Sequence, residues 1–370
     1  MAEPLKNHYG RHIPETIAGM ICAVYPDFPA VAFMDDVLKE YDSLELMSRG
    51  RHIARALRRH LPKDYTEAAE ILMASLGPPF DKIGDNGMSP FLYLPHVFFV
   101  AEFGLGHFAI SMRAQHALTQ RFTAEFSIRA YLEHHQDATL KMLRDWASDP
   151  SPHVRRLVSE GTRPRLPWAP RLKNFQRDPT PVLALLELLK DDPELYVRRS
   201  VANNLNDIGK DHPDLLVATA KAWLVGASPQ RVRLVRHALR SAIKNADAAA
   251  LSLLGYTAAP GLVLREGKIS PKRIPIGAST QIAFSVQNTG SKTLDVLVDF
   301  RVHFIKANGQ ASPKVFKLTA LTLAAGETKR LSKSISLAVH TTRKPFPGRH
   351  AVDVLLNGVT TPLGTFEVHS

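Results

Sequence analysis

The chain has 370 residues, of which 47 are basic and 35 acidic, and its formal net charge is +12. With 45% hydrophobic and 22% charged residues it can bury a sizeable core, which excludes a disordered chain. A transmembrane helix is not expected, because no apolar run of about 18 residues occurs. The first residues lack the basic and apolar segments of a signal peptide. A single cysteine, Cys22, excludes an internal disulfide, so we expect a cytoplasmic protein.

The positive charge is concentrated in the last two thirds of the chain. Residues 1–149 carry 15 basic and 19 acidic side chains, whereas residues 150–259 carry 17 and 10, and residues 260–370 carry 15 and 6. This distribution is expected of a protein that binds a polyanion with one part of its surface. The alternative is a generally basic protein without such a partner, and composition does not decide between them.

Residues 1–256 have the pattern of short helices joined by tight turns. Three helix starts are marked by a Ser or Thr followed by Pro, namely Ser151-Pro152, Thr180-Pro181 and Ser228-Pro229. The segments around Val154, Val197 and Val232 resemble one another, and these valines are 43 and 35 residues apart. This period is typical of HEAT-like helical pairs, so we expect an all-α solenoid.

An insertion rich in proline and basic residues follows the first repeat, from Arg163 to Lys173. Its prolines cannot continue a helix, so it is expected to form a loop around Trp168. Loops of this kind often carry the function of a solenoid.

From about residue 260 the hydrophobic period changes from helical to two. In residues 294–304, apolar residues such as Val296, Val298 and Phe300 alternate with more polar ones. Asn308-Gly309 and Asn357-Gly358 are hairpin turn signals. We therefore expect two domains, a helical solenoid over residues 1–256 and an immunoglobulin-like β-sandwich over residues 257–370. A small barrel is the alternative for the second domain.

Arginines recur at equivalent positions of the three repeats. Stacked repeats would align them in a stripe that suits successive phosphates. Alternatively, one arginine of each pair forms a salt bridge to an acid of the next repeat, such as Asp192 or Asp207. The set comprises Arg155, Arg156, Arg198, Arg199, Arg231, Arg233 and Arg236.

Two glutamates lie among these bases. Glu125 has an arginine four residues away on each side, and Glu160 lies four residues after Arg156 and three before Arg163. Spacing alone favours ion pairs on a helix surface, which contribute only about 0.3–0.5 kcal/mol each. The functional alternative is a carboxylate that faces a developing cation while nearby arginines bind phosphates.

The three tryptophans differ in their context. Trp146 and Trp223 occupy matching repeat positions, so we expect them in the core. Trp168 has no equivalent, which makes it the candidate for contact with a nucleobase or sugar. No metal-binding spacing of histidines and no glycine-rich nucleotide motif occurs, so neither a metal nor an organic cofactor is expected.

Three segments in order resemble the HEAT-like-repeat DNA alkylation repair glycosylases, in particular the AlkC branch with an immunoglobulin-like C-terminal domain. They are Arg121-Phe-Thr-Ala-Glu-Phe-Ser-Ile-Arg129, the run from Val154 to Trp168, and the run from Val197 to Ile208. The resemblance implies that Glu125 and Glu160 are active-site carboxylates and that Trp168 is an aromatic wall. It also implies that Arg155, Arg156, Arg163 and Asn203 lie near the DNA backbone or the lesion. Together with Arg165 of the basic loop and the repeated arginines Arg198, Arg199, Arg233 and Arg236, they form the expected DNA-contacting set.

The function implied by this resemblance is a monofunctional DNA glycosylase. It would excise 3-methyladenine and 3-methylcytosine from double-stranded DNA in base excision repair, as a monomer at the bacterial nucleoid. The basic C-terminal domain would hold the DNA against the solenoid. One alternative is a non-catalytic solenoid that binds damaged or branched DNA, and another is a protein-interaction scaffold. A glycosylase requires Glu125 and Glu160 to face the same cleft as the arginine stripe, whereas a scaffold requires a concave surface richer in apolar residues than in arginine.

Overall fold

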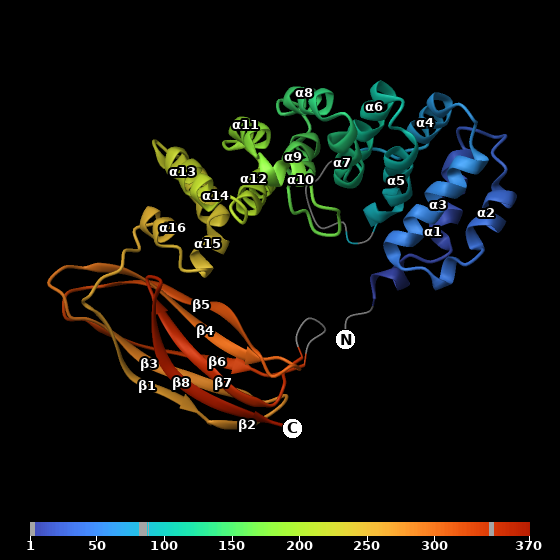
Figure 1. Cartoon of the computed structure of the whole chain (residues 1–370). Helices are drawn as coiled ribbons and strands as arrows, with labels where there is room; N and C mark the ends of the chain where they lie inside the picture. Colours follow the sequence, from blue (N-terminus) through green and yellow to red (C-terminus); the bar gives the residue numbers. More distant parts are fainter. Residues whose placement is uncertain (1–3, 81–86, 88, 340–343) are drawn as a thin grey trace. The chain divides into compact units, whose positions relative to one another are not determined.

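The computed structural model describes residues 4–80, 87, 89–339 and 344–370 (Figure 1). Its contacts divide the chain into two compact units. One contains the described residues up to His212 together with Ala227–Ala238, and the other contains Pro213–Gly226 and Leu239–Ser370. Among the described residues, no helix is both long and apolar enough to cross a membrane.

The described residues of the first unit form helices and no strand, and these helices follow one another in chain order (Figure 1). Short 3-10 turns occur at Leu5–His8, Tyr41–Ser43 and Ser89–Tyr93. The α-helices are α1 (His12–Cys22), α2 (Ala30–Leu38), α3 (Leu46–His60), α4 (Tyr65–Ala74), α5 (Leu94–Phe103), α6 (Phe108–Thr119), α7 (Glu125–His134), α8 (Gln136–Trp146), α9 (Pro152–Gly161), α10 (Lys173–Arg177), α11 (Thr180–Leu189), α12 (Leu195–Ile208) and α14 (Pro229–Ala238).

The repeated segments form successive helices of this unit. Val154, Val197 and Val232 lie in α9, α12 and α14, and α12 packs against both α9 and α14. Proline occupies the first turn of α9 and α11, as the Ser/Thr-Pro signals predict, because its missing N–H is not needed there. Trp146 is only 8% exposed, which confirms its expected place in the core.

The second unit combines three helices with all of the strands. Its helices are α13 (Pro213–Leu224), α15 (Arg240–Lys244) and α16 (Ala248–Leu253). Trp223, in α13, is 3% exposed and is a core residue as expected. The change from helices to strands falls between Leu253 and Leu262, close to the predicted boundary.

The strands form two sheets, in the order β1-β3-β6 and β2-β8-β7-β4-β5. This two-sheet arrangement confirms the sandwich and not the barrel. The strands are β1 (Leu262–Ser270), β2 (Arg273–Pro275), β3 (Ser279–Asn288), β4 (Leu294–Ile305), β5 (Ala311–Leu323), β6 (Thr328–Ser336), β7 (Gly348–Leu356) and β8 (Val359–His369).

The alternating residues of β4 explain why these sheets pack face to face. Val296, Val298, Phe300 and Val302 point into one apolar core, which they share with side chains of the three-stranded sheet. The predicted hairpin turns join β4 to β5 and β7 to β8. At the second turn, Gly358 has a φ of +84°, and an added Cβ would lie 2.5 Å from the side chain of Leu251, so only glycine fits.

Candidate active site

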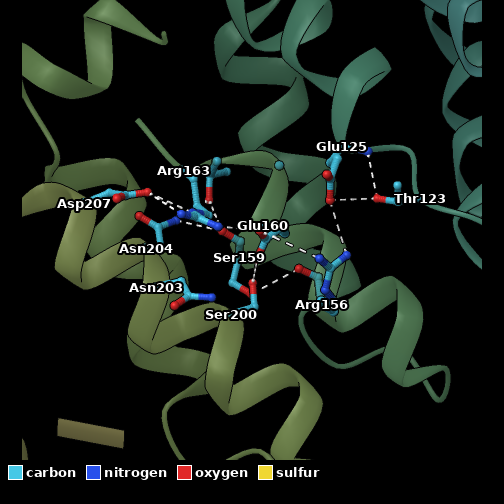
Figure 2. A network of polar contacts seen from close by, with 12 residues as sticks. Thr123, Glu125, Arg156, Ser159, Glu160, Arg163, Ser200, Asn203, Asn204 and Asp207 are labelled. Atoms are coloured by element: carbon cyan, nitrogen blue, oxygen red, sulfur yellow. Dashed lines mark hydrogen bonds and ion pairs between the residues drawn. The ribbon is translucent and has the colours of Figure 1, made fainter. Parts of the chain in front are cut away.

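The candidate site lies along α9, with α7 on one side and α12 on the other (Figure 2). Arg156, Glu160 and Arg163 follow one another at intervals of four and three residues, so their side chains leave the same side of this segment. On α12, Ser200, Asn204 and Asp207 have the same spacing. The two rows face each other, and we call them the α9–α12 seam.

Both oxygens of Glu160 accept hydrogen bonds. Arg163 Nη1 donates to Oε1 at 2.6 Å, and Ser200 Oγ donates to Oε2 at 2.6 Å. Arg156 Nη2 lies 3.7 Å from Oε1. Burial alone would raise the pKa of this carboxyl, but the charges of Arg156 and Arg163 and the bond from Ser200 outweigh it and lower the pKa. Glu160 is therefore a buried carboxylate that stays ionised.

Glu125 is the first residue of α7. Its Oε2 accepts hydrogen bonds from Thr123 Oγ1 at 3.0 Å and from Arg156 Nη1 at 3.3 Å. Burial raises the pKa of this carboxyl above its usual value, and the negative charge of Glu160 raises it further, against the opposing charge of Arg156. The two carboxyl groups thus differ in acidity because their surroundings differ.

Arg156 joins the two glutamates. One guanidinium nitrogen is paired with Glu125 and the other with Glu160, so both carboxylates face the same cation. The guanidinium carbon lies 5.0 Å from the centre of the Tyr196 ring, a cation–π contact. Arg156 is largely buried, with 20% of its side chain exposed. Within the protein it therefore holds the carboxylate pair together.

The sequence pattern does not identify Tyr196 as part of this site. The repeat could have pointed to Tyr196, because it directly precedes Val197 just as His153 directly precedes the equivalent Val154. Their rings are in contact, with centroids 5.7 Å apart. Ser200 was missed as well, since a serine within a helix carries no recognisable spacing.

The arginines flanking Glu125 do not form the surface ion pairs that their spacing favours. Arg121 donates instead to the carbonyls of Gly77 and Ala117. Arg129 donates to three carbonyls on and after the end of α9, those of Gly161, Arg163 and Pro170. Arg129 thereby anchors the proline-rich loop to α7, a role that the pattern did not reveal.

Several arginines of the predicted DNA-contacting set are bound within the protein. Their carboxylate partners all follow α11 in the chain. This is the result expected if these arginines form salt bridges to acids of the next repeat. The pairs are Arg155–Asp192 at 2.6 Å, Arg163–Asp207 at 2.8 Å and Arg165–Asp211 at 2.5 Å. Arg198 donates to the carbonyls of Asp192 and Pro193. Arg155, Arg163 and Arg165 thus fix the repeats to one another, whereas Arg198 holds the loop before its own helix.

The remaining members of the set face solvent. Arg199, Arg233 and Arg236 are exposed, and Asn203 is half-buried with its Oδ1 3.1 Å from His237 Nε2. A groove of about 230 Å³ lies on the surface where α12 and α14 meet. It is lined by Leu195, Arg198, Arg199, Ala202, Gln230, Arg233, Leu234 and His237. The described residues that line this groove include three arginines and no acidic side chain, which makes it electropositive.

Trp168 lies in the loop that follows α9, and 64% of the residue is exposed. Its φ is +64°, a left-handed conformation that costs a non-glycine residue about 1–2 kcal/mol. The buried neighbours Leu166 and Leu172 hold the loop on the helices at both sides of the tryptophan. The loop thus presents a large aromatic side chain to solvent.

This arrangement is suited to stabilising a cation. Two buried carboxylates share Arg156, and Glu160 is also paired with Arg163 at 2.6 Å, so both carboxylates are held by fixed cations. Fixed charges in a water-poor site act more strongly than in water, because they need no reorganisation. The described residues contain no cluster of three or more His, Cys, Asp or Glu that could hold a metal ion.

Comparisons with known proteins identify the family. Residues 121–246 match the model of the DNA alkylation repair enzymes, and residues 264–370 match the C-terminal Ig-like domain of the uncharacterised protein YhaZ. Uncharacterized protein YhaZ of Bacillus subtilis strain 168 is 37% identical over 365 residues, which are 98% of this chain and 99% of that protein. Glu125, Glu160 and Trp168 lie in the first matched segment.

A solved structure agrees over the whole length. It is Pseudomonas fluorescens alkylpurine DNA glycosylase AlkC bound to DNA containing an abasic site analogue, which is 35% identical. The match covers 100% of both chains with a TM-score of 0.92. These relationships confirm the resemblance carried by the three motifs, and the chain belongs to the AlkC family of DNA alkylation repair glycosylases.

Proposed function

We propose that this protein hydrolyses the N-glycosidic bond of cationic N3-alkylated bases in double-stranded DNA, with 3-methyladenine and 3-methylcytosine as substrates. The observation that carries the proposal is the pair of buried carboxylates, Glu125 and Glu160, held on one arginine. A site built only to bind DNA would gain nothing from buried negative charge, because phosphates repel it.

The chemistry of the substrate explains why two carboxylates suffice. An N3-alkylated base is already positively charged, so it can leave as a neutral base without being protonated. As the bond between the base and C1′ breaks, positive charge moves to the sugar. The carboxylates stabilise this oxocarbenium-like sugar and orient a water molecule, whose oxygen bonds to C1′ and whose proton passes to a carboxylate. The products are the free base and an abasic site.

The DNA bound by the relative of known structure supports base removal as the reaction. That AlkC is bound to DNA containing an abasic site analogue, which resembles the DNA product of base removal. In this chain, the exposed Trp168 is placed to contact the lesion or its sugar, since an aromatic face attracts a cation.

The exposed arginines of the predicted DNA-contacting set are the candidates for phosphate binding. Arg199 and Arg233 line the electropositive groove between α12 and α14, and Arg236 lies on the same helix as Arg233. We assign the phosphate contacts to these arginines and to Asn203. Arg155, Arg163 and Arg165 would first have to leave their carboxylate partners, so a supporting role suits them better.

The β-sandwich offers a second basic surface, on the outer side of its three-stranded sheet. Arg265 and Arg330 both pair in register with Ser285, one from each side, and both are exposed. The next row contains Lys268 beside the small residue Ala283. One carboxylate, that of Glu266, lies among these cations and accepts a hydrogen bond from Ser285 at 3.2 Å. The three exposed cations outnumber it, so this surface can bind a DNA backbone.

Every charged group of the candidate site comes from one chain, so no second copy is needed to complete it. We therefore propose a monomer. The two relatives are from bacteria, where chromosomal DNA lies in the cytoplasm, and we place the protein there as well.

Glu160→Gln should lower base release by about 100- to 1,000-fold, because the charge that stabilises the sugar cation is removed. DNA affinity should stay equal or rise, since a negative charge near the phosphates disappears. The measurement is release of free methylated bases from alkylated duplex DNA under single-turnover conditions. Glu70→Gln, an exposed glutamate of α4, is the matched control. An active Glu160→Gln protein would contradict the proposal and favour a non-catalytic DNA-binding function.

Trp168→Ala should slow base release while leaving the thermal unfolding temperature unchanged or slightly higher. The side chain is exposed, and alanine is no worse than tryptophan in the left-handed conformation. The control is Leu188→Ala, which removes an exposed apolar side chain of α11. A large fall in unfolding temperature for Trp168→Ala would show that the tryptophan is structural.

The double variant Arg265→Gln/Arg330→Gln should bind DNA with a shallower dependence of log affinity on log salt. The slope should fall by about one for each phosphate that the protein no longer neutralises. Lys292→Gln/Lys306→Gln makes the same change of charge at exposed turn positions of the sandwich and should keep the wild-type slope. The measurement is the DNA affinity of both double variants and of the wild-type protein over a range of salt concentrations. Equal slopes for both double variants and the wild type would mean that this sheet does not contact DNA.

A further inference from the structure

Glu160 is held by two helices at once. Arg163, near the end of its own helix, occupies Oε1, and Ser200 of α12 occupies Oε2 (Figure 2). Ser200 is 2% exposed and Glu160 is 5% exposed, so water cannot easily replace this bond. A carboxylate gripped at both oxygens from different helices cannot rotate about its last bond. The orientation of Glu160 therefore depends on α12.

The hydrogen bonds around Ser200 form a chain in which each donor can be assigned. A hydroxyl has one proton, and the short 2.6 Å contact with a charged oxygen commits the proton of Ser200 to Glu160. The oxygen of Ser200 is then free to accept from Ser159 Oγ, 2.7 Å away. Asn204 holds the same turn of α9 by donating to the Ser159 carbonyl at 2.7 Å. This chain of donors matches an ionised Glu160 and not a protonated one.

The rest of the seam keeps this arrangement rigid. Asp207 is 1% exposed and accepts from two nitrogens of Arg163, each at 2.8 Å, and from Lys210 at 2.8 Å. One turn before Ser200, the ring of Tyr196 supports Arg156. A single side of α12 thus fixes both cations that pair with Glu160.

We propose that Ser200 is a positioning residue for glycosidic bond hydrolysis, which orients Glu160 toward the sugar and keeps it charged. The inference rests on the proposed function, since Glu160 must be the group that acts on the substrate. Ser200 itself does not touch the DNA in this account. The bond from Ser200 is among the causes that hold the pKa of Glu160 below its usual value.

Ser200→Ala tests this role, because it removes only the hydroxyl and alanine is favourable in a helix. We expect base release to fall by about 10- to 100-fold under single-turnover conditions, while DNA affinity stays at the wild-type level. The acid limb of the pH–rate profile, which reports the Glu125–Glu160 pair, should move to higher pH. Ser200→Thr keeps a hydroxyl and should restore the wild-type pH profile.

Ser75→Ala is the matched control, since Ser75 is also buried and donates its hydroxyl to a carbonyl of its own helix, but lies in the distant α4 segment. It should leave the rate and the pH profile unchanged.

A Ser200→Ala protein with the wild-type rate and profile would overturn the inference. So would a slower protein whose pH profile is unchanged and whose unfolding temperature is lowered, because the role would then be structural only. If the wild-type protein itself releases no base, the proposed function fails and the role of Ser200 fails with it.

Discussion

The site depends on the pairing of one buried guanidinium, that of Arg156, with two buried carboxylates. Burying a charge without a partner costs several kcal/mol, and two neighbouring carboxylates would also repel each other. Arg156 makes their proximity possible by contacting Glu125 at 3.3 Å and Glu160 at 3.7 Å. Arg163, which pairs with Glu160 at 2.6 Å, adds a second cation to this network. Ionised carboxylates held in this way are what a cationic base and a cationic sugar require of their surroundings.

The helical stack explains how such a cluster can persist without collapsing or protonating. The repeat that contains α9 contributes a row of polar side chains, and the row on α12 pairs with it. Arg163 is paired with Asp207 and Arg155 with Asp192, in both cases across about 40 residues of sequence. The same salt bridges that join the repeats therefore also orient the side of α9 that carries the proposed catalytic carboxylate, Glu160.

Local patterns in the sequence predicted the change from helices to strands and several element starts, whereas the two candidate carboxylates were chosen through the resemblance to the family. The alternation of residues 294–304 predicted β4, and the proline signals predicted the start of α9, because both depend on near neighbours. The repeat also anticipated some partners across the fold, such as Asp192 for Arg155, but not those of the candidate site. Glu125 pairs with Arg156, 31 residues away, and not with the arginines four residues from it. Ser200 reaches Glu160 over 40 residues, and no spacing rule connects them.

The pH dependence of base release by the wild-type protein tests the central claim most directly. If ionised Glu125 and Glu160 stabilise the sugar cation and a cationic base needs no proton, the rate should be highest near neutral pH. It should then fall in acid, beginning above the usual carboxyl range, because burial raises the pKa of Glu125. After subtraction of spontaneous base loss, a rate that rises steadily as the pH falls would contradict the account, since it would require a protonated group.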